Sequence, residues 1–172
     1  MNKLYLAYGS NLSLEQMAWR CPHAYPVAAA TLKDHRLLYK GSKTGSDLTV
    51  EPSEGDTVPL IVWQIDADDE AMLDRYEGYP HFYYKKDVEV ELHSLRDGSP
   101  MGTGTGLIYI MHEERPLGRP SPTYVQICLE GYERFHLPAK CLYRALEDSI
   151  GTGPAHQMMK NICKATPGKE VF

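Results

Sequence analysis

The chain starts with a segment, Leu4–Leu12, whose pattern changes abruptly at its middle. Leucine and tyrosine dominate the first half, which is typical of a buried β-strand. Gly9-Ser10-Asn11 follow, and these residue types favour turns and tolerate unusual backbone angles. Ser13 then stands at an N-cap position with Gln16 three residues later, a capping box that predicts a helix over about residues 14–20. The pattern predicts a strand, a tight turn and a helix in immediate succession.

The next part of the chain carries short β-like runs between polar residues. We expect strands at Val27–Leu32, Arg36–Tyr39, Leu48–Val50, Pro59–Ile65 and Phe82–Leu92. The first two are expected to join near Lys33-Asp34, and a polar loop is expected over Gly41–Asp47. Asp66 predicts the N-cap of a helix that runs through Tyr76, because acidic residues fill its first turn, where the helix dipole favours them.

Glycine and proline punctuate the chain after residue 98. Ser99–Gly106 is rich in both and predicts a connection. Within it, Gly102–Gly106 lacks the GxGxxG spacing of a nucleotide-binding loop and precedes a strand instead of a helix, so it predicts a flexible hairpin loop. The strand that follows is expected at Leu107–Met111.

The last third of the chain is expected to be helical for most of its length. Ser121-Pro122 predicts a helix start, and apolar residues then recur at helical spacing as far as Phe135. A second helix is expected over Ala139–Ser149, ended by Gly151 and Gly153, while residues from His156 onward are weakly patterned. Many strands with segregated helices predict one α+β domain over residues 1–172, with a strongly curved or barrel-like mixed sheet.

Composition and charge narrow the functional classes. With 172 residues, 42% hydrophobic and 24% charged, the chain is ordinary for a globular domain. A net charge of −5 gives no electrostatic support for binding nucleic acid, and no apolar run has the length of a membrane span. No secretory pattern precedes the first strand, so we expect a cytoplasmic protein with reduced thiols at its cysteines. The sequence leaves the oligomeric state open.

The turn at Gly9-Ser10-Asn11 is a candidate anion cradle. Backbone N–H groups in a tight turn and at a helix N-terminus attract a carboxylate or phosphate. The alternative is an ordinary strand-to-helix connection.

Glu77 is the candidate acid–base residue. It stands at the last turn of a predicted helix, just before Gly78 and Pro80, and the negative end of the helix dipole there disfavours its charged form. Nearby aromatic residues would dry the site further, and both effects raise the pKa of a carboxyl as acid–base catalysis requires. The alternative is a solvated glutamate at a frayed helix end.

Metal and thiol chemistry have weaker support. Cys21-Pro22-His23 brings two ligand types together, but no second pair at ligand spacing accompanies it, so we expect no metal site. No cysteine has an evident histidine partner in sequence, and two disulfides would need a secreted protein. Among the twelve tyrosines, four flank the motifs above and are candidate pocket walls: Tyr8, Tyr83, Tyr84 and Tyr124.

These motifs together resemble the γ-glutamylcyclotransferase superfamily, including its AIG2-like branch. The resemblance is carried by Tyr8-Gly9-Ser10-Asn11-Leu12, Arg20-Cys21-Pro22, Tyr76-Glu77-Gly78-Tyr79-Pro80 with Phe82-Tyr83, and the later Pro122, Tyr124 and Gly131. It extends from about Leu4 to Pro138, and the last third of the chain matches least well. Members of the superfamily differ in their γ-glutamyl substrates.

The resemblance implies a small mixed β-barrel flanked by helices. It also implies that Tyr8, Gly9, Ser10, Asn11 and Leu12 shape a substrate cradle and that Glu77 is the general acid–base. Tyr124, with either Tyr83 or Tyr84, is expected to line the pocket, and the spacing does not choose between these two neighbours.

The implied reaction is simple enough for these residues. The α-amine of a γ-glutamyl group attacks its own γ-carbonyl, closes 5-oxoproline and releases the attached amine. Because the attack is intramolecular, holding the substrate folded supplies much of the catalysis. One carboxylate suffices, so we expect no metal, no cofactor and a small γ-glutamyl compound as the substrate. The alternative is a module that binds a γ-glutamyl or other small carboxylate ligand without turnover.

Overall fold

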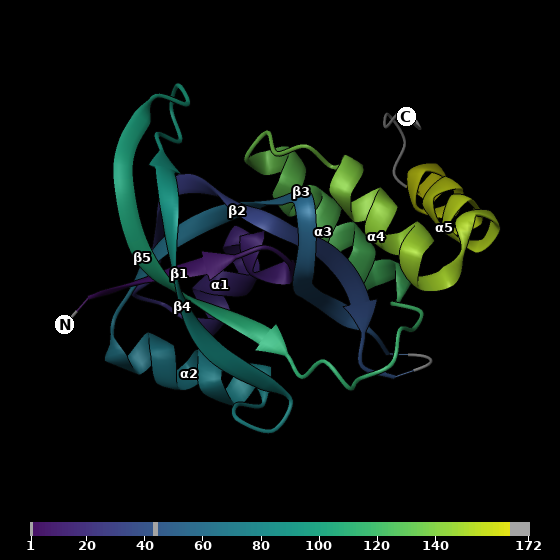
Figure 1. Ribbon diagram of the computed structural model, residues 1–172, viewed down its shortest axis with the longest axis horizontal. Helices are drawn as coiled ribbons and strands as arrows, with labels where there is room; N and C mark the ends of the chain where they lie inside the picture. Colours follow the sequence, from purple (N-terminus) through teal and green to yellow (C-terminus); the bar gives the residue numbers. More distant parts are fainter. Residues whose placement is uncertain (1, 43–44, 166–172) are drawn as a thin grey trace.

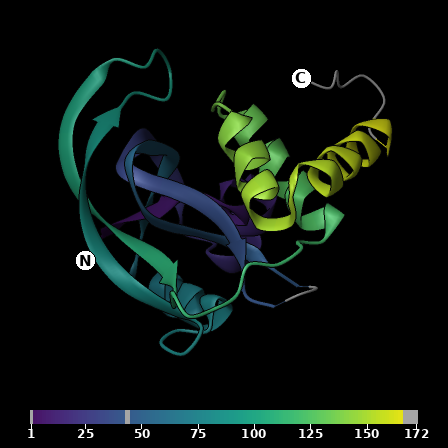
Figure 2. The same ribbon diagram turned by 45° about the vertical axis from the view of Figure 1, so that its right-hand side comes forward.

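The computed structural model describes residues 2–42 and 45–165; Met1, residues 43 and 44 of the expected polar loop and residues 166–172 of the expected tail lie outside this part. Its elements in chain order are β1 (Lys3–Ala7), the 3₁₀ turn η1 (Ser10–Leu12), α1 (Leu14–Arg20), β2 (Tyr25–Lys40), β3 (Asp47–Ile65), α2 (Ala67–Glu77), β4 (Tyr83–His93), β5 (Pro100–Met111), α3 (Pro122–Arg134), α4 (Lys140–Ile150) and α5 (Thr152–Ala165). Figures 1 and 2 show curled strands with α2 on one side and α3, α4 and α5 grouped on another.

The strands form a closed barrel in the order β1-β3-β2-β4-β5. Neighbouring strands are antiparallel except β1 and β5, which run parallel where Tyr5 faces Leu107. Closure leaves the barrel without a free sheet edge and buries large side chains such as Leu6, Ile61 and Trp63. The prediction of an α+β protein with a small mixed barrel flanked by helices is confirmed.

The predicted break near Lys33-Asp34 is wrong, because β2 continues through it. The pairing of β2 with β3 passes from Lys33–Thr57 to His35–Pro52, so residues 53–56 of β3 bulge opposite Asp34 alone. The Asp34 carboxylate accepts the Gly55 N–H at 2.9 Å and holds this bulge. The turn chemistry at Asp34 is real, but pairing along both strands merges the four expected strands into two.

The glycine-rich segment is also not a hairpin loop. Gly102, Gly104 and Gly106 belong to β5 and pair with β4, and the hairpin turn lies earlier, where Ser94 N–H donates to the Ser99 carbonyl at 2.9 Å. A Cβ atom at Gly106 would lie 2.7 Å from the buried Leu6 side chain. The glycines therefore allow β5 to approach the side chains of the barrel interior closely.

The helices follow the sequence pattern most closely. α1 covers the predicted residues 14–20, and Ser13 Oγ accepts the Gln16 N–H at 3.2 Å, although the Gln16 side chain contacts Arg20 instead of completing the capping box. Gly151 ends α4 at a φ of +87°, but Gly153 lies inside α5, a helix the sequence analysis did not predict. Buried Ala155, Met158 and Ile162 carry its helical spacing.

Candidate active site

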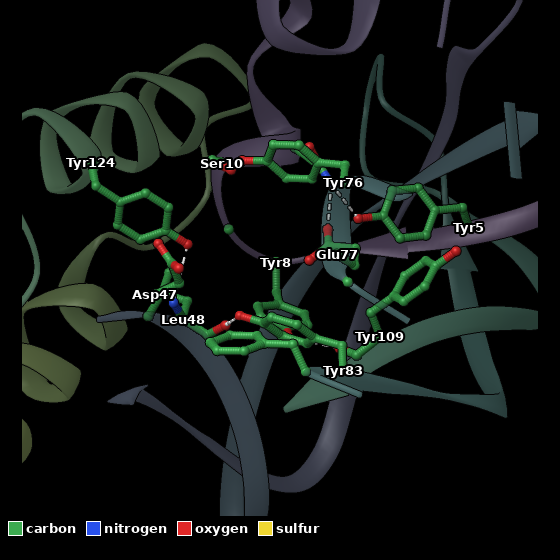
Figure 3. A pocket seen from close by; sticks show the side chains of 14 residues that line it. Tyr5, Tyr8, Ser10, Asp47, Leu48, Tyr76, Glu77, Tyr83, Tyr109 and Tyr124 are labelled. Carbon is green, nitrogen blue, oxygen red and sulfur yellow. Dashed lines mark hydrogen bonds between the residues drawn. The ribbon is translucent and has the colours of Figure 1, made fainter. Parts of the chain in front are cut away.

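A cavity of about 470 Å³ opens where the end of β1, η1, the start of β3 and the end of α2 meet (Figure 3). The lining residues are Tyr5, Tyr8, Gly9, Ser10, Asn11, Asp47, Leu48, Tyr76, Glu77, Gly78, Phe82, Tyr83, Tyr109 and Tyr124. Seven of the fourteen are aromatic, and they come from β1, α2, β4, β5, α3 and the segments directly after β1 and before β4. The cavity thus gathers both sequence motifs although they lie far apart in the chain.

The turn after β1 has the free donors that an anion cradle requires. Its two internal hydrogen bonds run from Leu12 N–H to the Gly9 carbonyl and from Ser13 N–H to the Ser10 carbonyl, both at 3.0 Å. Within residues 2–42 and 45–165, the N–H groups of Gly9, Ser10 and Asn11 donate no hydrogen bond. Gly9 fits closely against α3, because a Cβ there would lie 3.2 Å from the Tyr124 hydroxyl. These three residues line the cavity.

Leu12 occupies a different position from the one expected. It does not line the cavity; its side chain is fully buried, and its N–H is already used within the turn. A Cβ at Gly131 of α3 would lie 2.6 Å from the Leu12 Cβ, so the turn rests directly on this helix. Leu12 supports the turn through this contact, and it does not itself line the cavity as expected.

Glu77 is the last residue of α2, and its carboxylate faces the turn. Asn11 Nδ2 donates to Glu77 Oε1 at 3.1 Å and to the Tyr5 hydroxyl at 2.7 Å (Figure 3). Gly78, at a φ of +64°, ends the helix in the left-handed conformation that glycine adopts without strain. The helix end therefore places the carboxylate inside the cavity.

The pKa of Glu77 is raised to about 7. Burial is the main cause, and the negative charge of Asp47 raises the pKa further, while Arg20 and the Asn11 hydrogen bond lower it. Enclosure by the cavity wall thus replaces the helix dipole as the dominant reason for the predicted shift. A carboxyl with a pKa near neutrality exchanges protons readily at physiological pH.

Arg20 organises this part of the site from behind, and the sequence analysis assigned it no role. Its guanidinium donates to Asn11 Oδ1 and to Gln16, contacts Ser10 Oγ at 3.4 Å, and lies 3.5 Å above the Tyr76 ring. Because Arg20 occupies the Asn11 oxygen, the amide nitrogen is directed toward Glu77. The available signal was the spacing of Gln16 and Arg20, four residues apart on one helix face.

The tyrosines differ in how they contribute to the cavity. Tyr8 donates to the Tyr109 carbonyl at 2.7 Å, Tyr83 donates to the Leu48 carbonyl at 2.8 Å, and the Tyr124 hydroxyl accepts the Leu48 N–H at 3.0 Å. These bonds hold each ring in the wall.

The choice between Tyr83 and Tyr84 follows from strand alternation. Successive side chains of a strand point to opposite faces, and Tyr83 lines the cavity. Tyr84 does not; its hydroxyl donates to Glu113 at 2.6 Å instead. Of the two alternatives that the spacing left open, Tyr83 is therefore the one that lines the cavity.

Asp47 is the charged cavity residue that the sequence analysis missed. It is the first residue of β3, at the end of the expected polar loop, and it is partly buried. Burial raises the pKa of its carboxyl, and the positive charge of Arg20 opposes this effect. No local pattern distinguishes Asp47 from a solvated loop aspartate.

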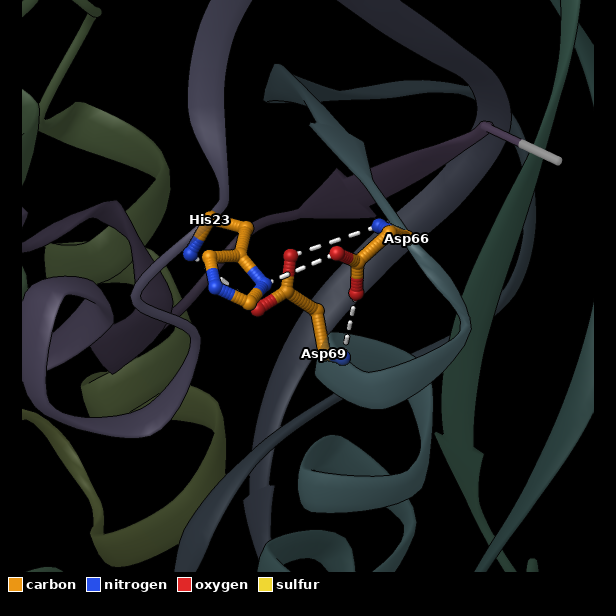
Figure 4. A group of neighbouring side chains, drawn as sticks. All are labelled: His23, Asp66 and Asp69. Carbon is orange, nitrogen blue, oxygen red and sulfur yellow. Dashed lines mark hydrogen bonds and ion pairs between the residues drawn. The ribbon is translucent and has the colours of Figure 1, made fainter.

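One group of side chains in the described residues has metal-ligand types close together, namely His23, Asp66 and Asp69. Figure 4 shows that hydrogen bonds already occupy them. His23 Nδ1 lies 2.8 Å from Asp66 Oδ2, and Asp66 and Asp69 cap the start of α2 through each other's backbone N–H. The group lies outside the cavity and serves to fasten the helix start.

The cysteines are also outside the cavity wall. All four are unpaired, and burial raises the pKa of the Cys21 thiol to about 12. A thiol that remains protonated at neutral pH is a poor nucleophile.

Comparison with known proteins agrees with the fold. Residues 5–132 match the family model described as gamma-glutamyl cyclotransferase, AIG2-like. The human gamma-glutamylcyclotransferase is 31% identical over 170 residues, covering 94% of this chain and 87% of the human protein, and the bovine gamma-glutamylcyclotransferase is 32% identical over 175 residues, covering 96% and 90%. A solved gamma-glutamyl cyclotransferase structure superposes with a TM-score of 0.65 at 30% identity, covering 81% of this chain and 83% of that one.

The chain belongs to the AIG2-like γ-glutamyl cyclotransferase family. The prediction of a γ-glutamylcyclotransferase-type enzyme is thereby confirmed at the level of the family. YkqA from Bacillus subtilis, with a TM-score of 0.66 at 20% identity over 86% of this chain and 55% of that one, shares the fold. Among the described residues, no helix combines the length and apolar character needed to cross a membrane.

Proposed function

We propose that this protein converts a γ-glutamyl amide into 5-oxoproline and a free amine, with Glu77 as the general acid–base. The observation that carries the proposal is the position of one carboxyl with a pKa of about 7 beside three unpaired backbone N–H groups in a single cavity. A base and an anion-binding turn are the two elements that this cyclisation needs.

The reaction proceeds through one tetrahedral intermediate at the γ-carbonyl carbon of the substrate. The N–H groups of Gly9, Ser10 and Asn11 hold the α-carboxylate of the substrate, which places its α-ammonium near Glu77. Glu77 removes a proton from the ammonium, and the resulting amine attacks the γ-carbonyl carbon to form the lactam C–N bond. The protonated Glu77 then returns its proton to the leaving nitrogen as the bond between that nitrogen and the carbonyl carbon breaks. The attacking nitrogen loses its second proton as the carbonyl re-forms, and this proton passes through Glu77 to the released amine, which leaves as an ammonium. Atoms and charge balance without any redox partner.

The walls of the cavity would supply the folded geometry. Tyr8, Tyr83 and Tyr124 are fixed by hydrogen bonds, so the cavity is already shaped before substrate enters. Pre-formed geometry matters here because an intramolecular attack gains its rate from a substrate held with the reacting atoms close together. The volume of about 470 Å³ suits a small γ-glutamyl compound, in a protein that we expect to be cytoplasmic.

Replacing Glu77 by glutamine tests the proposal. Glu77→Gln keeps the volume and can still accept the Asn11 hydrogen bond, but it cannot transfer the proton, so we expect the rate of 5-oxoproline formation to fall about 10²–10⁴-fold. Glu89→Gln, an exposed change on β4, is the matched control and should leave the rate unchanged. A near wild-type rate for Glu77→Gln would exclude Glu77 as the base.

Thermal unfolding separates loss of chemistry from loss of fold. The folded-state pKa of Glu77, about 7, lies above the ordinary value of 4.5. The folded protein therefore holds more protons than the unfolded chain between these values, and this group lowers stability as the pH rises through that window. Glutamine lacks the buried charge, so Glu77→Gln should be at least as stable as wild type at about pH 8.

If wild type binds γ-glutamyl compounds but forms no 5-oxoproline from any of them, the binding-module alternative replaces this proposal.

A further inference from the structure

The charge of the cavity wall is one-sided. Asp47 and Glu77 are the charged residues among those described as lining it, and both are acidic. Arg20 does not line the cavity, because its guanidinium is engaged with Asn11, Ser10 and Gln16 behind the turn. A ligand that enters the cavity therefore meets two carboxyl groups and no cationic side chain of the described residues.

Among residues 2–42 and 45–165, Asp47 has no partner that neutralises it. Its carboxylate makes no hydrogen bond and no ion pair with any described residue, although the residue is partly buried. Burial removes part of the hydration of this charge, and for that reason it raises the pKa of the carboxyl. A partly desolvated carboxylate without a partner is stabilised when a cation binds beside it.

The position of Asp47 assigns it to the part of the substrate that leaves. In Figure 3, Asp47 lies beside Tyr124 and Leu48 and apart from Glu77, which lies between Asp47 and Tyr5. The α-ammonium and α-carboxylate of the γ-glutamyl group share one carbon, so in the proposed reaction both lie near the turn and Glu77. The leaving amine extends from the γ-carbon, and its far end is then the part of the substrate that can extend to Asp47.

The free donors of the turn also limit what the leaving group carries. In the proposed reaction the α-carboxylate occupies the N–H groups of Gly9, Ser10 and Asn11. A second carboxylate, carried by a leaving amino acid, finds no further cation in the described wall and lies near the negative charge of Asp47.

We propose that Asp47 is a specificity-determining residue that binds a positively charged group at the far end of the leaving amine. The preferred substrates are then γ-glutamyl amides of cationic amines, ahead of those whose leaving group ends in a carboxylate. This inference rests on the proposed function, because it takes the γ-glutamyl head to be held at the turn.

Three γ-glutamyl amides of nearly equal length test it. They are the amides of 1,4-diaminobutane, pentylamine and 5-aminopentanoate, whose tails end in an ammonium, a methyl and a carboxylate. In wild type we expect kcat/KM to decrease in that order, with about tenfold or more between the ammonium and carboxylate tails. Asp47→Asn should reduce this ratio to about threefold or less, whereas Asp87→Asn, an exposed change on β4, should keep it.

Each other outcome overturns the proposal or separates it from the proposed function. A wild-type order independent of tail charge overturns it, and so does an equal loss for all three amides in Asp47→Asn, since Asp47 would then hold the γ-glutamyl head or the fold. If wild type forms no 5-oxoproline from any amide, the proposed function fails. Calorimetric binding of the same three amides then decides about Asp47: a preference for the ammonium tail that Asp47→Asn removes supports its role, and any other result overturns it.

Discussion

Opposing neighbours set the pKa of Glu77. Burial and the charge of Asp47 raise it, while Arg20 and the Asn11 amide lower it. Since Arg20 also fixes the orientation of Asn11, one cation both moderates the acidity of the base and positions its hydrogen-bond donor. The balance leaves the carboxyl with a pKa near neutrality, where it can accept a proton and return it.

The pH dependence of turnover should report this balance. Arg20→Gln removes a positive neighbour, so the pKa of Glu77 rises and the acid limb of kcat/KM moves to higher pH. Asp47→Asn removes a negative neighbour and should move the same limb to lower pH. Profiles measured between about pH 5 and 9 compare both with Arg134→Gln, an exposed change on α3. Displacement of both limbs in one direction would contradict this account of Glu77.

The position of the anion cradle depends on the packing of η1 against α3. Gly131 is buried in α3 directly against Leu12, and α3 also contributes Tyr124 to the cavity wall. The close approach of helix and turn requires the absence of a side chain at position 131, since a Cβ would lie 2.6 Å from Leu12 Cβ and 3.2 Å from its carbonyl carbon. The position of the free N–H groups is therefore set by helix packing as well as by the turn itself.

Gly131→Ala should lower both stability and activity, although residue 131 does not line the cavity. We expect the free energy of unfolding to fall by about 1–3 kcal/mol through overpacking, and kcat/KM to fall about 10–100-fold as the turn moves. Urea unfolding and 5-oxoproline assays measure the two effects. Gly153→Ala in α5 is the matched control, because a Cβ there meets nothing within 4 Å. It should leave kcat/KM unchanged and should not lower the free energy of unfolding, since alanine favours a helix more than glycine does. A wild-type free energy of unfolding and a wild-type kcat/KM for Gly131→Ala would show that the turn does not need this close packing against α3.

At the scale of the whole molecule, the barrel brings together two motifs that no local interaction joins. Asn11 and Glu77 form a hydrogen bond although they are 66 positions apart. The same architecture keeps His23, Asp66 and Asp69 outside the cavity. They lie at the start of α2, which Asp66 and Asp69 cap. The carboxylates of Asp66 and Asp69 both accept hydrogen bonds from described residues.

Turnover should therefore be independent of added metal. We expect dialysis against EDTA to leave the rate of 5-oxoproline formation unchanged, and added zinc not to raise it, because the engaged ligand atoms of this group would have to give up their hydrogen bonds to bind an ion. A rate that is lost with the chelator and restored by zinc would contradict the expectation.

Local patterns determined the parts of this protein whose structure depends on near neighbours in the chain. α1 and α2 begin at the expected caps, Ser13 and Asp66, because the bonds that start a helix join residues three or four apart. The strand–turn–helix at Leu4–Arg20 and the helix end at Glu77-Gly78 were predictable for the same reason, and so were most of the residues proposed for the reaction.

Only the tertiary structure decided the features that depend on distant partners. Pairing with β4 makes Gly102–Gly106 a strand, and β2–β3 pairing carries both strands through the polar residues at Asp34. Alternation places Tyr83 and Tyr84 on opposite faces, but barrel closure decides which face borders the cavity. Asp47 gives no local signal at all. Its significance comes from the cavity in which it stands, since burial and charge are properties of the folded surroundings and not of the neighbouring residues in sequence.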